Sequence, residues 1–329
     1  MGACARRDHG PGRACSDGGA ARRPRPRDRH RGAERRDHPL GRRRPRGDDR
    51  RRTPDGGRGM TALTLRIDGG GSATHAHAAV ATLASLPESF RRTDDAGDVV
   101  VVAGGAGWAG RATAAARSGV RAILVLEPGP AADAELADLA EAGVPVVLDV
   151  PWRHDEAVRR VAPRIHRLAA PGALFEARAT VASTDDLAGS ARALALTAQV
   201  LVGSPLTELA PLAETPDHYM LSGSTASGVH VIVSAVVTAH AHACATFRLV
   251  VGDRAAHVVL PAPGTAAPGR ASVTDAAGRE DLPVVFESGH RTAMRLARDA
   301  AHGRCVPDDV ADLRSLLAAA PALAADARP

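Results

Sequence analysis

The chain has 329 residues, of which 44% are hydrophobic and 2% aromatic, enough for two domains with cores built mainly of Ala, Val and Leu. All 42 basic residues are arginine, which excludes any mechanism that needs a lysine amine. No apolar run reaches the roughly 20 residues of a membrane helix and no cysteines have C-x-x-C spacing, so we expect a cytoplasmic protein without a membrane partner.

Residues 1–59 hold 19 of the arginines, 8 acidic residues and very few apolar side chains. Such a segment cannot bury enough apolar surface to offset its ordering entropy, so we predict that it is disordered. Because the segment is positively charged, a less favoured alternative is that it forms an arm that binds nucleic-acid phosphates. The simpler interpretation is a disordered extension, or translated sequence upstream of a natural start at Met60.

From Leu63 onward, short apolar runs alternate with Ala-rich amphipathic stretches, which is typical of a parallel α/β sheet. We therefore predict a shortened Rossmann-like domain over residues 60–168. Its strands are expected over 63–67, 98–104, 121–129 and 144–150, and its helices over 74–86, 111–118 and 132–142.

After residue 168 the pattern changes to successive strands joined by Gly-containing turns, which favours an antiparallel sheet. We predict an α+β domain over residues 169–329. Its strands are expected over 206–212, 229–237, 243–251, 257–260 and 271–274, and its helices over 186–202, 287–302 and 308–317.

A glycine turn, Gly69 to Thr74, directly follows the first predicted strand and opens a helix. In this setting glycines let backbone amides approach a pyrophosphate. The third glycine position of the dinucleotide pattern is occupied by Thr74, so an ordinary tight turn remains the alternative.

With that turn, the chain resembles the glucose-fructose oxidoreductase and inositol dehydrogenase family, called Gfo/Idh/MocA. Four segments are similar to the family in the same order: the glycine turn with its following histidine, a strand and helix, a Glu-Pro segment with the next helix and strand, and an arginine-bearing loop. These segments cover 69–77, 98–120, 122–150 and 152–155.

The resemblance implies an NAD- or NADP-dependent oxidoreductase that transfers hydride to or from a hydroxyl carbon of a sugar or polyol. It implies a small-molecule, sugar-like substrate and the following site residues. The expected cofactor-binding residues are Gly69, Gly71, Ser72, Ala73, Gly104, Gly105, Glu127 and Pro128. The expected substrate-lining residues are Trp108, Arg153 and His154, because they lie just past predicted strands at the edge where α/β sheets bind ligands. Arg153 and His154 are also the candidates for catalysis.

Several positions depart from the family pattern. Glu127 stands where the family has an active-site lysine, and Gly189 and Ala193 fall where it has an aspartate and a histidine. About a dozen residues separate the first helix from Asp98, too few for the further strand and helix of a full dinucleotide fold. The rival hypothesis is therefore a noncatalytic homologue that forms homo- or hetero-oligomers through its C-terminal sheet.

Other candidates have simpler explanations. Arg153 and His154 could belong to a solvated loop, and Trp108 could fill space. His240, His242 and Cys244 would share one face of a strand, but they lack a further ligand nearby in the sequence, so we predict no metal site.

Overall fold

The computed structural model describes residues 62–324, except 69, 71, 72, 87, 185, 186, 240–243, 264 and 266. The segment predicted to be disordered, 1–59, lies outside the described residues, as do three of the expected cofactor-binding residues, Gly69, Gly71 and Ser72. No helix in the described part is both long and apolar enough to span a bilayer.

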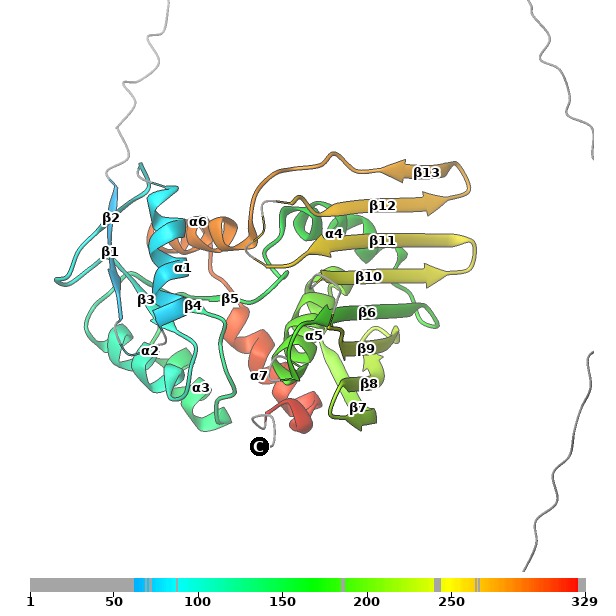
Figure 1. Ribbon diagram of the computed structural model, residues 1–329, viewed down its shortest axis with the longest axis horizontal. Helices are drawn as coiled ribbons and strands as arrows, with labels where there is room; N and C mark the ends of the chain where they lie inside the picture. The colour runs from blue at the N-terminus through cyan, green and yellow to red at the C-terminus, as the bar shows by residue number, and fades with distance from the viewer. Residues whose placement is uncertain are drawn as a thin grey trace, which may run out of the picture. The chain divides into compact units, whose positions relative to one another are not determined.

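The first half forms a five-stranded, wholly parallel sheet in the order β2-β1-β3-β4-β5 (Figure 1). Every residue of its central strands β3 and β4 is buried, because helices cover both faces of a parallel sheet. The predicted Rossmann-like sheet is therefore confirmed. Its strands are β1 (Leu63–Ile67), β2 (Phe90–Arg92), β3 (Val99–Ala103), β4 (Ala122–Leu126) and β5 (Val146–Asp149), and the helices between them are α1 (Ala73–Ala84), α2 (Trp108–Arg117) and α3 (Asp133–Glu141).

The sequence interpretation left out one strand of this sheet. The short stretch before Asp98 contains β2, which pairs in parallel with β1 at the sheet edge. The expectation that a strand is missing there was wrong. In the described residues, no helix separates β2 from β3. Only Phe90 of β2 is buried, so the strand lacks the apolar run that made the other strands recognisable.

The second half forms an eight-stranded sheet in the order β13-β12-β11-β10-β6-β9-β8-β7. All neighbouring strands are antiparallel except β6 and β9, so the predicted mainly antiparallel sheet is confirmed. Two helices, α4 (Glu156–Leu168) and α5 (Leu187–Val202), pack against it. The strands are β6 (Leu174–Val181), β7 (Leu206–Thr215), β8 (His218–Thr225), β9 (His230–Val237), β10 (Cys244–Val251), β11 (Arg254–Pro261), β12 (Arg270–Asp275) and β13 (Gly278–Asp281).

The end of the chain returns to the first sheet. Helix α6 (Gly289–Ala301) packs on β4 and β5, and its buried Met294 shares a core with Leu65 and Leu124. Helix α7 (Asp309–Ala319), followed by a short 3-10 turn at Pro321–Leu323, contacts β5, α3 and α5. This return places C-terminal side chains beside the strand ends of the N-terminal sheet.

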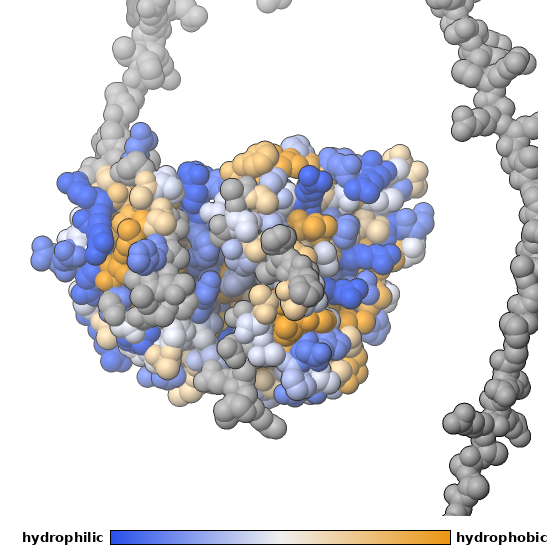
Figure 2. All heavy atoms as spheres, viewed as in Figure 1, coloured by the Kyte–Doolittle hydropathy of each residue, from blue (hydrophilic) through white to orange (hydrophobic). Residues whose placement is uncertain are grey.

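The segment that joins β13 to α6 carries exposed apolar side chains. Phe286 is 75% exposed and Val284 is 45% exposed. Figure 2 shows an apolar patch at the upper margin of the molecule, where this segment runs in Figure 1. The segment leads directly into Glu287 and Ser288, which line a cavity described below.

Candidate functional site

The carboxyl ends of the parallel strands meet at one edge of the sheet, where open α/β folds bind ligands. The peptide N–H of Gly129 donates to the carbonyl of Gly104 (2.7 Å), and that of Glu127 donates to the carbonyl of Asp149 (3.0 Å). A Cβ on Gly104 would lie 2.0 Å from the Glu127 carbonyl oxygen, so only glycine permits this close approach. The loops that follow β3, β4 and β5 are thus joined through their backbones.

Two residues of this edge have strained backbones. Glu127 has a φ of 47° and Trp152 a φ of 67°, and they are the only non-glycine residues with positive φ in the described part of the chain. Such conformations cost about 1 to 3 kcal/mol each and cluster at functional sites. Glu127 directly follows β4, Trp152 belongs to the loop after the neighbouring strand β5, and both line the same cavity. The strain therefore marks this cavity as the candidate site.

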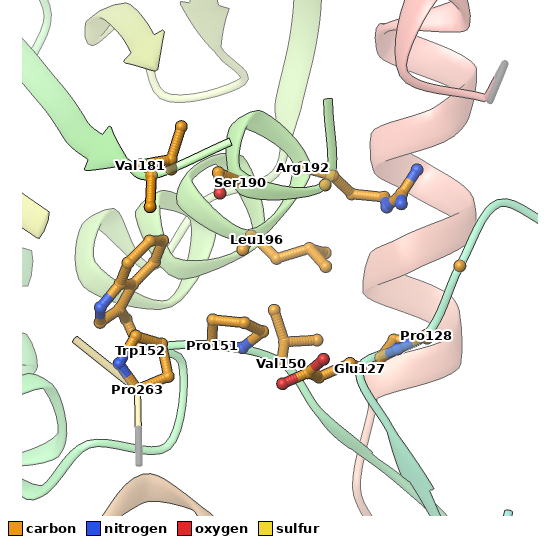
Figure 3. A pocket seen from close by; sticks show the side chains of 14 residues that line it. Glu127, Pro128, Val150, Pro151, Trp152, Val181, Ser190, Arg192, Leu196 and Pro263 are labelled. Atoms are coloured by element: carbon orange, nitrogen blue, oxygen red, sulfur yellow. The ribbon is translucent and has the colours of Figure 1, made fainter. Parts of the chain in front are cut away.

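The cavity has a volume of about 350 Å³ and lies between the edge of the parallel sheet and helix α5. In Figure 3, Trp152 lies on one side of the cavity, Glu127 and Pro128 lie on the other, and Leu196 of α5 lies between them. Its walls are mostly apolar, with Glu127 and Arg192 as the charged residues. The lining residues are Glu127, Pro128, Gly129, Val150, Pro151, Trp152, Val181, Ala182, Gly189, Ser190, Arg192, Ala193, Leu196 and Pro263.

Among the residues expected to bind the cofactor, Gly104, Glu127 and Pro128 come together at this edge, and Gly105 is exposed beside them. A Cβ on Gly105 would meet nothing within 4 Å, which leaves room for a ligand. Ala73 is the first residue of α1, the helix that follows the neighbouring strand β1.

Trp108, expected to line the substrate site, is fully buried instead. Its indole N–H donates to the carbonyl of Gly129 (3.0 Å), so it fixes the loop after β4. Trp152 occupies the cavity wall, with its indole N–H donated to the carbonyl of Pro261 (3.0 Å). The rule that selected Arg153, namely a position just after a strand, applies equally to Trp152 and could have found it.

Arg153 and His154 are only 5% and 7% exposed and face the protein interior. The Arg153 guanidinium contacts Asp309 (2.8 Å) and Asp312 (2.5 Å), and His154 Nε2 lies 2.8 Å from the carbonyl oxygen of Leu148. Neither residue belongs to the cavity lining. Both side chains contact Asp309, the first residue of α7. They therefore fasten α7 to the loop after β5.

This buried cluster shifts the ionisation of its members. Burial disfavours the Asp309 carboxylate, but the Arg153 charge, His154 and the Leu148 N–H together outweigh burial and hold the pKa of Asp309 well below its usual range. Burial likewise disfavours the Arg153 cation, and its two carboxylate partners still raise the pKa of Arg153. Both groups are therefore charged at neutral pH.

The crevice between β1 and β3, where the strand order reverses, is bridged by Arg111 of α2. Its guanidinium donates to the carbonyls of Ala103 and Ala106 (both 2.7 Å), and its Nε lies 3.2 Å from an oxygen of Asp68. A pyrophosphate at a switch point binds at a helix N-terminus, and a nearby cation adds to the attraction. Arg111 supplies the cation, and α1 has no acidic residue in its first turn, so the chemistry of the residues present fits a dinucleotide.

The pairing of His290 with Asp149 had no counterpart among the expected site residues. His290 Nδ1 lies 2.5 Å from the carboxylate of Asp149 at the end of β5. The two positions are 141 residues apart, so no local pattern could have joined them.

The metal-site alternative rests on residues that lie partly outside the described chain. His240 and His242 are not described. The thiol of Cys244, the third residue of that stripe, lies 3.3 Å from the hydroxyl of Thr180 on β6.

No protein-family model and no curated protein matches the chain. Solved structures do match it. The UDP-N-acetylglucosamine 3-dehydrogenase of Acidithiobacillus ferrooxidans is 17% identical with a TM-score of 0.55, over 79% of this chain and 96% of that one. A 3-ketoreductase of Actinomadura kijaniata, solved with NADP and TDP-benzene, is 13% identical with a TM-score of 0.57, over 77% and 94% of the two chains.

A dehydrogenase of Clostridium difficile is 9% identical with a TM-score of 0.53, over 78% of this chain and 97% of that one. At these identities the similarity shows the fold alone. The chain has the fold of these dehydrogenases and reductases, so the fold expected from the family resemblance is confirmed. Gly189 and Ala193, aligned from the sequence with the family's Asp and His, both line the cavity.

Proposed function

We propose that this protein is an NAD(P)-dependent oxidoreductase that acts on a hydroxyl or carbonyl carbon of a sugar-like molecule. The observation that carries the proposal is the cavity between the edge of the parallel sheet and α5, which is lined by the two strained residues Glu127 and Trp152. The nicotinamide, when bound, supplies a hydride acceptor or donor.

The residues of the edge suggest how the cofactor is held. Arg111 and the N-terminus of α1 would hold the pyrophosphate at the switch point, with the turn of Gly69, Gly71, Ser72 and Ala73. The exposed backbone of Gly105 would pass beneath the nicotinamide, and Glu127 and Pro128 would border it. The apolar walls of Trp152, Val150 and Leu196 would exclude water from the reacting carbon.

A second function, a noncatalytic homologue that assembles with a related enzyme through the eight-stranded sheet, is favoured by one observation. The cavity contains Glu127, Gly189 and Ala193 at the positions where the sequence resemblance places a lysine, an aspartate and a histidine. Gly189 and Ala193 have no titratable side chain, and Glu127 puts an acid where a lysine would supply a cation, so the proton-transfer step loses the groups that the family uses.

Titration of the full chain with NADPH, NADH, NADP⁺ and NAD⁺ by calorimetry tests the proposal. We expect saturable binding of one molecule per chain for at least one of the four. Trp152 fluorescence provides a second measurement, since a reduced nicotinamide near an indole quenches its emission, and Trp152→Phe should remove most of the quenching while Trp108 still emits.

No binding of any of the four dinucleotides would refute the proposal. Oxidation of glucose, myo-inositol and UDP-N-acetylglucosamine with NADP⁺ or NAD⁺ separates the two functions. Turnover of any of them supports the enzyme. Cofactor binding without turnover, together with capture of a related dehydrogenase as partner, would favour the noncatalytic homologue.

A further inference from the structure

A histidine and a carboxylate form a close pair at the carboxyl end of β5. His290 is the second residue of α6, and Asp149 is the last residue of β5. His290 Nδ1 lies 2.5 Å from Asp149 Oδ2, and the two side chains are 20% and 3% exposed. A hydrogen bond at one ring nitrogen fixes the tautomer and orientation of an imidazole, so the second nitrogen is the one available for chemistry.

The pair lines a cavity that adjoins the candidate site. His290 and Asp149 line a small cavity together with Asp155, Glu287 and the segment 150–152. The same segment lines the larger cavity that contains Glu127. Within the described residues, Nε2 of His290 has no hydrogen-bond partner. The imidazole is therefore held in one orientation beside a cavity at the edge where the parallel strands end.

The electrostatic surroundings suit an imidazole that gains and loses a proton. The hydrogen bond to Asp149 raises the pKa of His290, burial opposes this effect, and the charges of Asp149 and Glu127 add to the increase. Two other carboxylates line the small cavity: Asp155, whose pKa is raised chiefly by burial, and Glu287, which is paired with Arg295 (2.8 Å). Acidic groups thus face the imidazole from β4, β5 and the loops beside them.

We propose that His290, oriented by Asp149, is the acid–base residue of this site and exchanges a proton with the oxygen of the sugar-like substrate. The inference rests on the proposed function. In the oxidative direction, the substrate hydroxyl gives its proton to Nε2 while the carbinol hydrogen leaves with two electrons to an oxidised nicotinamide, and a carbonyl remains. In the reductive direction, His290 returns the proton to the oxygen. A residue of α6, which packs on the first sheet, thereby performs a proton transfer for which Gly189 and Ala193 have no titratable side chain.

Histidine-ring NMR of the full chain tests the position of His290 without relying on activity. The signal that disappears in His290→Gln identifies the residue among the 14 histidines. We expect Asp149→Asn to lower its titration midpoint. We also expect a lower midpoint in the NADP⁺ complex than in the NADPH complex, because a cationic nicotinamide nearby disfavours a charged imidazole and a neutral one does not. The signal of His218, on β8, should titrate identically in both complexes.

Equal midpoints of His290 in the two complexes, with cofactor bound, would overturn the inference and leave the proposed function intact. Failure of the unaltered chain to bind either cofactor would overturn both. For the sugar that the unaltered chain oxidises in the panel above, His290→Gln should slow turnover about 10²- to 10⁴-fold with NADPH affinity unchanged, whereas His218→Gln should retain the rate. Full turnover by His290→Gln would likewise overturn the inference.

Discussion

Replacement of Asp309 by alanine is expected to lower the free energy of unfolding by about 3 to 5 kcal/mol. The carboxylate is buried and contacts the equally buried Arg153 at 2.8 Å. It also accepts the backbone N–H of Leu148 (2.8 Å). Alanine leaves the buried Arg153 cation with only the partly exposed Asp312 carboxylate as its anion, and it leaves the buried N–H of Leu148 without its acceptor. Both effects destabilise the folded chain. Urea unfolding, followed by circular dichroism, measures the loss.

The neighbouring residue provides a matched control. Asp308 precedes Asp309 at the start of α7, is exposed, and makes no side-chain hydrogen bond to the helix. Its replacement by alanine should change the free energy of unfolding by no more than about 0.5 kcal/mol. Equal losses in the two variants would contradict the view that Arg153 and Asp309 fasten α7 to the parallel sheet.

Replacement of Gly104 by alanine is expected to destabilise the chain by about 1 to 3 kcal/mol or more and to abolish cofactor binding. The added Cβ would lie 2.0 Å from the carbonyl oxygen of Glu127 and 2.3 Å from that of Leu126. Both are backbone atoms at the end of a buried strand, so a side-chain rotation cannot relieve the clash. The loop that holds Glu127 must move away from β3. Thermal unfolding and NADPH calorimetry measure the two effects.

Gly105→Ala separates the two effects. The same added atom at Gly105 would meet nothing within 4 Å, so stability should stay within about 0.5 kcal/mol of the unaltered chain. If the nicotinamide lies against this backbone, NADPH affinity should nevertheless fall. A stable Gly104→Ala variant that binds NADPH normally would show that the close contact between β3 and β4 is not part of the site.

The sequence predicted those elements whose burial produces a strong local pattern. The strands β3 and β4 are continuous apolar runs because both faces of the sheet are covered, and they were recognised. Strand β6 was missed. Its buried residues alternate with polar ones such as Glu176 and Arg178, and this period of two is that of a half-buried strand. The strand could nevertheless be overlooked because Ala, Glu and Arg are good helix formers.

The candidate site could be predicted only where one rule of topology applied. Parallel strands end at one edge, so Gly104, Glu127 and Pro128 could be placed together without coordinates. The orientation of Arg153 depends on Asp309, 156 residues later, and the role of His290 depends on the return of α6 to the first sheet. Such contacts between distant segments have no periodicity in the sequence, which explains why the inward orientation of Arg153 and the pairing of His290 were not foreseen.

Hydrogen–deuterium exchange of the full chain with and without NADPH tests the site most directly. NADPH should slow exchange of the amides at 104–107 and at 127–129 together, since both segments border the proposed nicotinamide position. The turn between β10 and β11, at residues 252 and 253, should exchange at the same rate in both samples. Protection confined to the eight-stranded sheet, or no protection at the carboxyl edge of the parallel sheet, would contradict the account.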